Sequence, residues 1–438
     1  MRVLFAAFPL PSHLYPMIPL AHALQTAGHE VVVATQPGTF DPDMLATVVA
    51  AGLQVVPLGV KEDLDDMVRA RFGGTHPELR TDALALTEDA ANWESVRHSM
   101  VFQWKWHYRV ESPVEDSRPV VDHLVDFARA WQPDLVLWDP LFFPAPIAAR
   151  AVGAAHARVL FGLDNVGLVR QKGVEQLRGE GRSPDEDPLV TWMRPMLQRY
   201  GMEYDEELLL GQWTIDPQRT GHRLPLDYRY LPVSGAPYNG VTVVPEWLRE
   251  KPRRPRVCLT LGQTGRPRLR HADSEISIRE LMEMVAGLDV EVVATLNADQ
   301  RAVAGPIPDN VRTVDYLPLN LLLPSCAAIV HHGGPGTTAA AAVHGVPQLI
   351  VPYVRWDEPV QSRYVADRGA GIAIPDEELS VEALRKALEA ILGEASYREG
   401  AAALRTDVGA APSPNELVPV LERLTRAQRR GGEHAAGR

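Results

Sequence analysis

The chain has 438 residues, more than one ordinary hydrophobic core accommodates, which indicates two domains. Its 44 basic and 56 acidic side chains give a formal net charge of −12, which disfavours nucleic acid as a partner. Prolines interrupt the apolar N-terminus, and no apolar run approaches the ~18 residues of a membrane span, so we expect neither a signal peptide nor a membrane segment. Cys258 and Cys326 lie in strand-like runs and indicate core thiols of a reduced, cytoplasmic protein.

The N-terminus predicts one strand–loop–helix–strand unit. Residues 3–7 form an apolar run typical of a buried parallel strand, residues 16–27 have helical apolar spacing, and residues 30–34 form a second strand-like run. The loop at 8–15 carries His13 just after the first strand, where ligands bind in doubly wound sheets. Position alone favours a functional histidine and a loop histidine without a role about equally.

Further apolar runs at 53–58, 134–139 and 155–161 predict additional strands. The second of them ends in Asp139, which by residue type alone could cap the helix that follows. Residues 60–120 lose the strand–helix alternation and carry a cluster of aromatic side chains, for which we favour packing over binding of a hydrophobic ligand. The cluster comprises Trp93, Phe102, Trp104, Trp106 and Tyr108.

A basic, proline-punctuated stretch at 251–255 marks a domain boundary. Strand–helix alternation resumes after it, and residues 428–438 look like a frayed tail. The predicted fold class is α/β, with two Rossmann-like doubly wound domains facing across a cleft. In the second half we expect strands at 256–261, 290–295, 311–314, 326–330 and 348–352, and helices at 276–288 and from about 359 and 381 onward. The predicted parts are a first domain at 1–235, a linker at 236–255, a second domain at 256–415, and a C-terminal helix and tail at 416–438 that crosses back to the first domain.

The segment His331-His332-Gly333-Gly334-Pro335-Gly336-Thr337-Thr338 lies between a strand-like run and an alanine-rich helix. The unpaired N–H groups and partial positive charge of a helix N-terminus suit a phosphate. Because proline has no N–H group, we expect the N–H groups of Gly336 and Thr337, the Thr337 hydroxyl and one histidine to face it. On residues alone, a packed glycine-rich turn explains this segment about as well.

The same segment, together with His344-Gly345-Val346-Pro347-Gln348 and residues 352–357, resembles the nucleotide-sugar signature of the inverting glycosyltransferase superfamily, which has the GT-B fold. Residues 12–30, from Ser12-His13 to Gly28-His29-Glu30, resemble that superfamily too. Two further stretches, Gly211-Gln-Trp-Thr-Ile-Asp-Pro217 and the segment from Tyr238-Asn239-Gly240 to Leu248, resemble its antibiotic deoxysugar transferases of the macrolide and anthracycline type. The former stretch is typical of members that work with a cytochrome-like activator protein.

The resemblance implies a role for the first domain in binding the acceptor. It makes His13 the general base and Asp139 the carboxylate that pairs with it. This suits the chemistry, because a neutral histidine can take the proton of a hydroxyl group and a carboxylate behind it stabilises the imidazolium.

The resemblance also implies that the second domain binds the nucleotide-sugar donor. In that alignment His332 contacts the diphosphate, and His331 belongs to the preceding strand. Where the family has an Asp-Gln pair at the sugar, this chain has Asp357 and Glu358, so the identity of the sugar does not carry over, and Glu358 faces either an amino sugar or solvent. The expected donor contacts are His332, Gly334, Gly336, Thr337 and Thr264 at the diphosphate, Leu317 and Pro318 at the nucleoside, and Asp357 and Glu358 at the sugar.

We therefore expect transfer of a deoxysugar from a dTDP donor to a hydroxyl group of a hydrophobic polyketide acceptor, with inversion. No cofactor and no metal are expected, since Asp63, Asp65 and Asp66 lie in a charged helical run and form no convincing metal pair. A nucleotide-sugar 2-epimerase and a non-catalytic partner protein are the alternatives, and a homodimer is left open. A dehydrogenase is disfavoured because no Gly-x-Gly-x-x-Gly follows the first strand.

Overall fold

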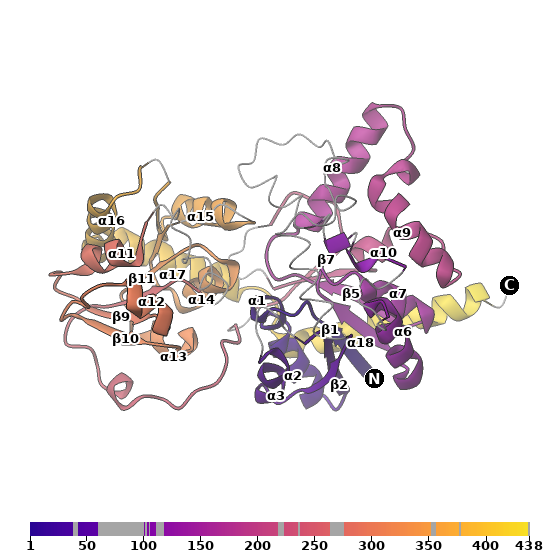
Figure 1. The fold of residues 1–438 in the computed structure, drawn as a ribbon, viewed down its shortest axis with the longest axis horizontal. Coiled ribbons are helices and arrows are strands. Elements are labelled where there is room, and N and C mark those ends of the chain that lie inside the picture. The colour runs from indigo at the N-terminus through magenta and orange to yellow at the C-terminus, as the bar shows by residue number, and fades with distance from the viewer. Residues whose placement is uncertain are drawn as a thin grey trace. The chain divides into compact units, whose positions relative to one another are not determined.

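The computed structural model describes residues 1–37, 43–59, 100, 103–104, 106–110, 118–217, 223–234, 237–262, 276–351, 356–375 and 378–436. These residues fold into two compact units, each with its own parallel sheet and surrounding helices (Figure 1). The first unit contains Met1–Pro217, Arg223–Val233 and Pro412–Arg438, and the second contains Ser234–Ala411.

The first unit has a seven-stranded parallel sheet in the order β3-β2-β1-β4-β5-β6-β7. The chain builds outward from β1 in one direction and from β4 in the other, so the switch point of the sheet lies between these two strands. The strands are β1 (Arg2–Ala6), β2 (Glu30–Thr35), β3 (Gln54–Pro57), β4 (Leu135–Trp138), β5 (Ala155–Val159), β6 (Thr214–Asp216) and β7 (Tyr230–Pro232). The helices are α1 (Pro11–Leu14), α2 (Ile18–Thr26), α3 (Met44–Ala50), α6 (Val120–Trp131), α7 (Pro144–Ala151), α8 (Asn165–Gly179), α9 (Pro188–Arg199), α10 (Glu207–Leu210) and α18 (Pro414–Ala436).

The second unit repeats this plan with a six-stranded parallel sheet in the order β10-β9-β8-β11-β12-β13. Its switch point lies between β8 and β11. The strands are β8 (Arg256–Thr260), β9 (Glu291–Thr295), β10 (Val311–Val314), β11 (Ala328–His331), β12 (Gln348–Ile350) and β13 (Gly371–Ala373). The helices are α11 (Ile278–Val285), α12 (Ala298–Val303), α13 (Leu319–Leu322), α14 (Pro335–His344), α15 (Glu358–Asp367), α16 (Val381–Gly393) and α17 (Ala395–Gly409). The predicted fold class, α/β with two Rossmann-like sheets, is confirmed.

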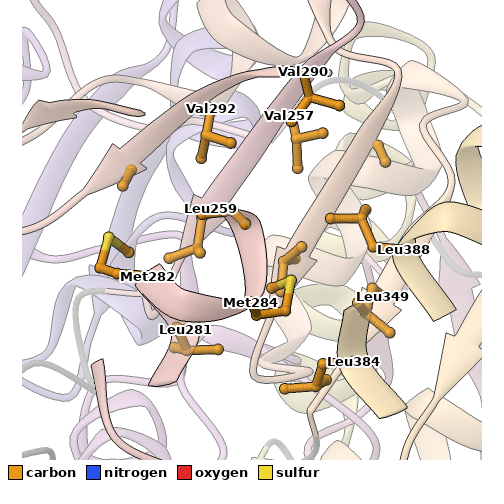
Figure 2. Packing of buried hydrophobic residues seen from close by; sticks show 14 of the residues in the cluster. Val257, Leu259, Leu281, Met282, Met284, Val290, Val292, Leu349, Leu384 and Leu388 are labelled. Atoms are coloured by element: carbon orange, nitrogen blue, oxygen red, sulfur yellow. The ribbon is translucent and has the colours of Figure 1, made fainter. Parts of the chain in front are cut away.

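The helices α11 and α16 pack with the second sheet in one buried apolar cluster (Figure 2). The helix α11 begins with a capping box, in which the Ser277 hydroxyl accepts the Glu280 N–H and the Glu280 carboxylate accepts the Ser277 N–H. The apolar side chains of α11 then pack on strand residues. Each fully buried side chain contributes roughly 1.5–3 kcal/mol to the free energy of folding. Figure 2 labels Val257, Leu259, Leu281, Met282, Met284, Val290, Val292, Leu349, Leu384 and Leu388 of this cluster.

The C-terminal helix α18 belongs to the first unit. Leu417 and Leu421 are buried, and Arg429 forms an ion pair with Asp134, just before β4. The helix continues to Ala436, so the predicted frayed tail at 428–438 is wrong for the described part of that segment.

Within the described part of the chain, every helix is too short or too polar to span a bilayer.

Candidate active site

His13 and Asp139 lie at the switch point of the first sheet. The register pairs Ala6 of β1 with Trp138 of β4, so the residues that follow both strands meet at one edge. The Asp139 N–H donates to the Ala6 carbonyl at 2.9 Å, which extends the ladder by one residue. His13 lies in the one-turn helix α1, not in the loop that the sequence predicts, because the chain turns at Leu10, whose carbonyl accepts the His13 N–H at 3.0 Å.

The two side chains form a buried pair. His13 Nδ1 is 2.7 Å from Asp139 Oδ2, and the two residues are 7% and 0% exposed. Because a carboxylate only accepts, Nδ1–H is the donor, and in the neutral form of the ring Nε2 then carries the lone pair. The other oxygen, Asp139 Oδ1, accepts the Leu141 N–H at 2.8 Å. Asp139 therefore holds the following turn and orients His13 at the same time, although it does not cap α7, which begins at Pro144.

Two phenylalanines, neither of them predicted from the sequence to have a role, pack against His13. The Phe161 ring, two residues after β5, lies with its centroid 3.8 Å from that of the imidazole at an interplanar angle of 36°. Phe8 lies 5.2 Å away at 54°. These rings restrict the imidazole to one orientation. An aromatic residue just after a strand at the ligand-binding edge is the signal that could have drawn attention to Phe161.

The glycine-rich segment occupies the equivalent switch point of the second sheet. The register pairs His331 of β11 with Thr260 of β8. The buried His331 side chain accepts the Gly333 N–H at Nδ1 (3.1 Å) and donates from Nε2 to Gln348 Oε1 (2.9 Å). Burial, with a smaller effect of the neighbouring His332, lowers the pKa of His331 to about 3, so the ring is neutral. His331 thus shapes the turn from inside, as expected for a strand residue.

His332 is held between two glycines. A Cβ atom built on Gly334 would lie 2.5 Å from His332 Nε2, and one built on Gly262 would lie 2.5 Å from His332 Cε1. Any side chain at either position would displace the imidazole. Gly262 follows β8 and Gly334 precedes α14, so the space for this ring at the switch point depends on glycine at both positions.

The first turn of α14 differs from the expectation in one respect. The Thr337 N–H donates to the Gly334 carbonyl at 3.0 Å, and the Thr338 N–H donates to the same oxygen at 3.0 Å. The Thr337 N–H is thus engaged within the turn, because Gly334 at the N-cap turns its carbonyl into the helix. Gly336 is exposed and Thr337 half-buried, so the Gly336 N–H and the Thr337 hydroxyl remain the groups suited to an anion.

The other expected donor contacts lie in the second unit as well, apart from Thr264, which falls outside the described residues. Leu317 is buried and Pro318 is the N-cap of α13, in the short connection from β10 to α13. Asp357 is fully buried at the N-cap of α15. Glu358 is only 7% exposed, and its Oε2 accepts the Trp356 N–H at 2.8 Å, so the alternative of a solvent-facing Glu358 is wrong.

The aromatic cluster belongs to the core. Among its described members, Trp104 donates from Nε1 to the Leu189 carbonyl, Tyr108 donates to the Phe143 carbonyl, and Trp106 is 7% exposed. Trp93 and Phe102 fall outside the described residues. For the described residues, the structure bears out packing over an exposed binding surface.

The stretch from Gly211 to Pro217 contributes a buried strand. Residues 213–216 are buried, and Arg158 of β5 donates its N–H to the Trp213 carbonyl at 3.2 Å. Its central side chains therefore serve the sheet and present no exposed surface to a partner.

No group of three or more His, Cys, Asp or Glu side chains suited to a metal ion occurs in the parts of the chain that the structure describes. The two candidate clusters thus consist of a histidine–carboxylate pair on the first sheet and an imidazole beside a helix N-terminus on the second.

Known proteins share this architecture over almost the whole chain. The 2-deoxy-L-fucose transferase for aclacinomycin T from Streptomyces galilaeus is 41% identical, with 98% of this chain and 97% of the relative aligned. The 10-deoxymethynolide desosaminyltransferase from Streptomyces venezuelae is 42% identical, with 98% of each chain aligned. The crystal structure of the glycosyltransferase VinC in complex with dTDP is 39% identical, with a TM-score of 0.80 over 98% of this chain and 100% of that one.

The chain also matches both domains of one protein family. Residues 22–262 match the N-terminal domain, and residues 279–424 match the C-terminal domain, of the erythromycin biosynthesis protein CIII-like family. The chain therefore belongs to this family of glycosyltransferases.

Proposed function

We propose that this protein transfers a deoxysugar from a dTDP donor to a hydroxyl group of a hydrophobic polyketide-type acceptor, with inversion at the anomeric carbon. The observation that carries the proposal is the buried pair of His13 and Asp139 at 2.7 Å. The named relatives support the substrates, since two of them are transferases of 2-deoxy-L-fucose and desosamine, and VinC was solved with dTDP.

In this mechanism His13 activates the acceptor. The acceptor oxygen attacks the anomeric carbon of the sugar, and its proton passes to His13 Nε2. The new C–O bond forms as the bond from the anomeric carbon to the diphosphate oxygen breaks, and that electron pair leaves with dTDP. A single in-line displacement of this kind inverts the anomeric carbon. The Asp139 carboxylate stabilises the imidazolium that forms and fixes Nδ1–H as the donor.

The departing diphosphate gains negative charge as its bond to the sugar breaks. In our proposal the His332 imidazole, the Gly336 N–H and the Thr337 hydroxyl stabilise that charge, aided by the positive end of α14. In our proposal these groups are in place before the reaction, since Gly262 and Gly334 leave room for the His332 ring and His331 shapes the turn. We propose on this basis that the reaction requires neither a metal nor another cofactor.

We also propose a helper protein of the cytochrome-like activator type as a partner of the first unit. The support is the resemblance of Gly211–Pro217 to members that use one, together with the loss of strand–helix alternation in the sequence at 60–120. Because residues 213–216 are buried in the sheet, the partner would act on a neighbouring surface. The purified chain should then turn over slowly alone and faster when co-purified with such a partner, whereas full activity alone would refute this part.

The proposed function is tested by titrating dTDP and UDP into the chain and then screening dTDP-deoxysugars against polyketide aglycones by mass spectrometry. We expect dTDP to bind, a glycosylated aglycone to form, and the anomeric configuration in the product to be opposite to that of the donor. Turnover should persist in excess chelator. Retention of configuration would contradict the single displacement, and turnover that is lost with chelator and restored by Mg²⁺ would contradict the metal-free proposal. An epimerised donor without transfer would point to the 2-epimerase instead.

A further inference from the structure

The segment Tyr238-Asn239-Gly240, which opens the linker, makes contacts that the proposed mechanism does not use. It belongs to the second unit and lies against the end of β10 and the start of α13, where Leu317 and Pro318 are the expected nucleoside contacts. The Tyr316 hydroxyl donates to the Asn239 carbonyl, and the Asn320 N–H donates to Asn239 Oδ1 at 3.1 Å. Hydrogen bonds on both sides of Leu317-Pro318 therefore tie this pair to the linker.

Asn320 links this pair of segments to a third one. Its Nδ2 donates to the Pro237 carbonyl, and its Oδ1 lies 3.1 Å from Nε2 of His344, in the last turn of α14. Burial, with a smaller effect of Arg405, lowers the pKa of His344, so the ring is neutral and Nε2–H is the donor to Oδ1. Asn320 thus uses its backbone N–H and both ends of its amide to join the linker, α13 and the phosphate-binding helix.

Apolar packing joins the same segments without fixing their orientation. Leu317 and Leu322 share a buried cluster with Ala340 and Ala341 of α14, and Trp247 of the linker packs against it. Apolar contact is non-directional, whereas hydrogen bonds require a defined distance and angle. The cluster should therefore keep the region folded without Asn320, while the bonds of Asn320 determine where the segments lie.

We propose that Asn320 is a positioning residue of the donor site. It fixes the position of segment 316–318, the expected nucleoside contact, relative to α14, the expected phosphate-binding helix. A nucleoside diphosphate then meets both segments without a prior rearrangement, and its binding free energy is not spent on ordering them. This inference rests on the proposed function, because the family resemblance behind that function implies that the nucleoside lies at Leu317 and Pro318.

The test compares Asn320→Ala with a matched control, Asn310→Ala. Asn310 is also a half-buried asparagine of the second unit, and its Nδ2 also donates to backbone carbonyls, those of Val285 and Leu288 at 2.9 and 3.3 Å, but it lies at the opposite end of β10. Dissociation constants for dTDP are measured by calorimetry, and inorganic pyrophosphate is measured as a competitor of the donor. Thermal unfolding is recorded for both variants.

We expect Asn320→Ala to weaken dTDP about 10-fold and to raise the donor KM about equally, with kcat at saturating donor within about 2-fold of the parent. Pyrophosphate inhibition should stay at the parental value, because the diphosphate contacts are not moved. His344→Ala should weaken dTDP less, and the double variant should resemble Asn320→Ala, since the two residues share one bond.

Parental dTDP affinity in Asn320→Ala would overturn the inference, as would an equal loss in Asn310→Ala or an equal loss of pyrophosphate binding. A merely structural Asn320 would lower the unfolding temperature without the split between KM and kcat. If the parent chain binds pyrophosphate and donor sugar but binds dTDP no more tightly than pyrophosphate, this inference is overturned while the proposed function stands. A parent chain that binds no dTDP at all would overturn the proposed function together with it.

Discussion

Replacing Gly334 by alanine is expected to displace the His332 imidazole while leaving the backbone unchanged. Gly334 has φ −59° and ψ 140°, which alanine adopts without strain. The new Cβ would lie 2.5 Å from His332 Nε2, whereas ordinary van der Waals contact begins at 3.4 Å, so the ring must move by about 1 Å. The ring is the end of a flexible side chain, and the cost to folding should therefore stay below about 1 kcal/mol.

The cost to the proposed reaction should be much larger. A displacement of about 1 Å takes a fixed hydrogen-bond donor out of reach of the charge it stabilises, which typically costs about 10²-fold, or roughly 2.7 kcal/mol of transition-state stabilisation. The assay measures kcat/KM for a dTDP-deoxysugar and the denaturant-induced unfolding of the same sample. Gly393→Ala is the matched control, since it also lies in the second unit and its Cβ would meet no atom within 4 Å. Parental kcat/KM in a folded Gly334→Ala protein would refute the role of the His332 ring.

Three further outcomes are expected from changes in the first unit. Phe161→Leu should lower kcat about 10-fold with dTDP affinity unchanged, because the His13 imidazole loses the ring that restricts it. The control Phe127→Leu removes a stacked pair with Trp131 on α6 and should leave kcat at the parental value, so equal effects of the two variants would contradict the role of Phe161 in orienting His13. Asp139→Asn retains an oxygen for the Leu141 N–H but removes the carboxylate that faces His13, so kcat should fall about 10²-fold or more while the unfolding midpoint changes little. A large loss of stability with parental kcat would instead show that Asp139 only stabilises the turn. Burial lowers the pKa of His156 to about 3, so below about pH 6.5 the unfolded chain binds a proton there that the folded chain does not, and the free energy of unfolding falls as the pH falls. In His156→Phe the slope of the unfolding free energy against pH, between about pH 6 and 4, should therefore be smaller by about 1.4 kcal/mol per pH unit. An unchanged slope would contradict this.

The sequence predicts the fold class because its strands are long apolar runs followed by helices with clear ends. Three strands, β6, β7 and β13, were not predicted, since each has only three residues and is too short to show a period; β12 is as short but was recognised within the longer run at 348–352. The edge strand β7 is also only partly buried and ends in proline. Their positions depend on pairing with neighbouring strands, which a local pattern does not contain.

The contact between His13 and Asp139 was expected only from the family resemblance, and the structure shows its basis, since both residues follow strands that meet at the switch point of one sheet. The roles assigned to them stay predictions. Phe161 was missed because its position after β5 indicates only the ligand-binding edge, and the sequence does not tell that its ring reaches across to His13. Asn320 was missed for a similar reason, since its partners Pro237, Asn239 and His344 are distant along the chain.

The central claim is that His13 takes the proton of the acceptor, and the turnover of His13→Ala tests it most directly. The proposed donor contacts lie in the second unit, so dTDP affinity should match the parent, while kcat should fall by about 10²–10⁴-fold. A folded His13→Ala protein that binds dTDP and turns over at the parental rate at every pH would contradict the account.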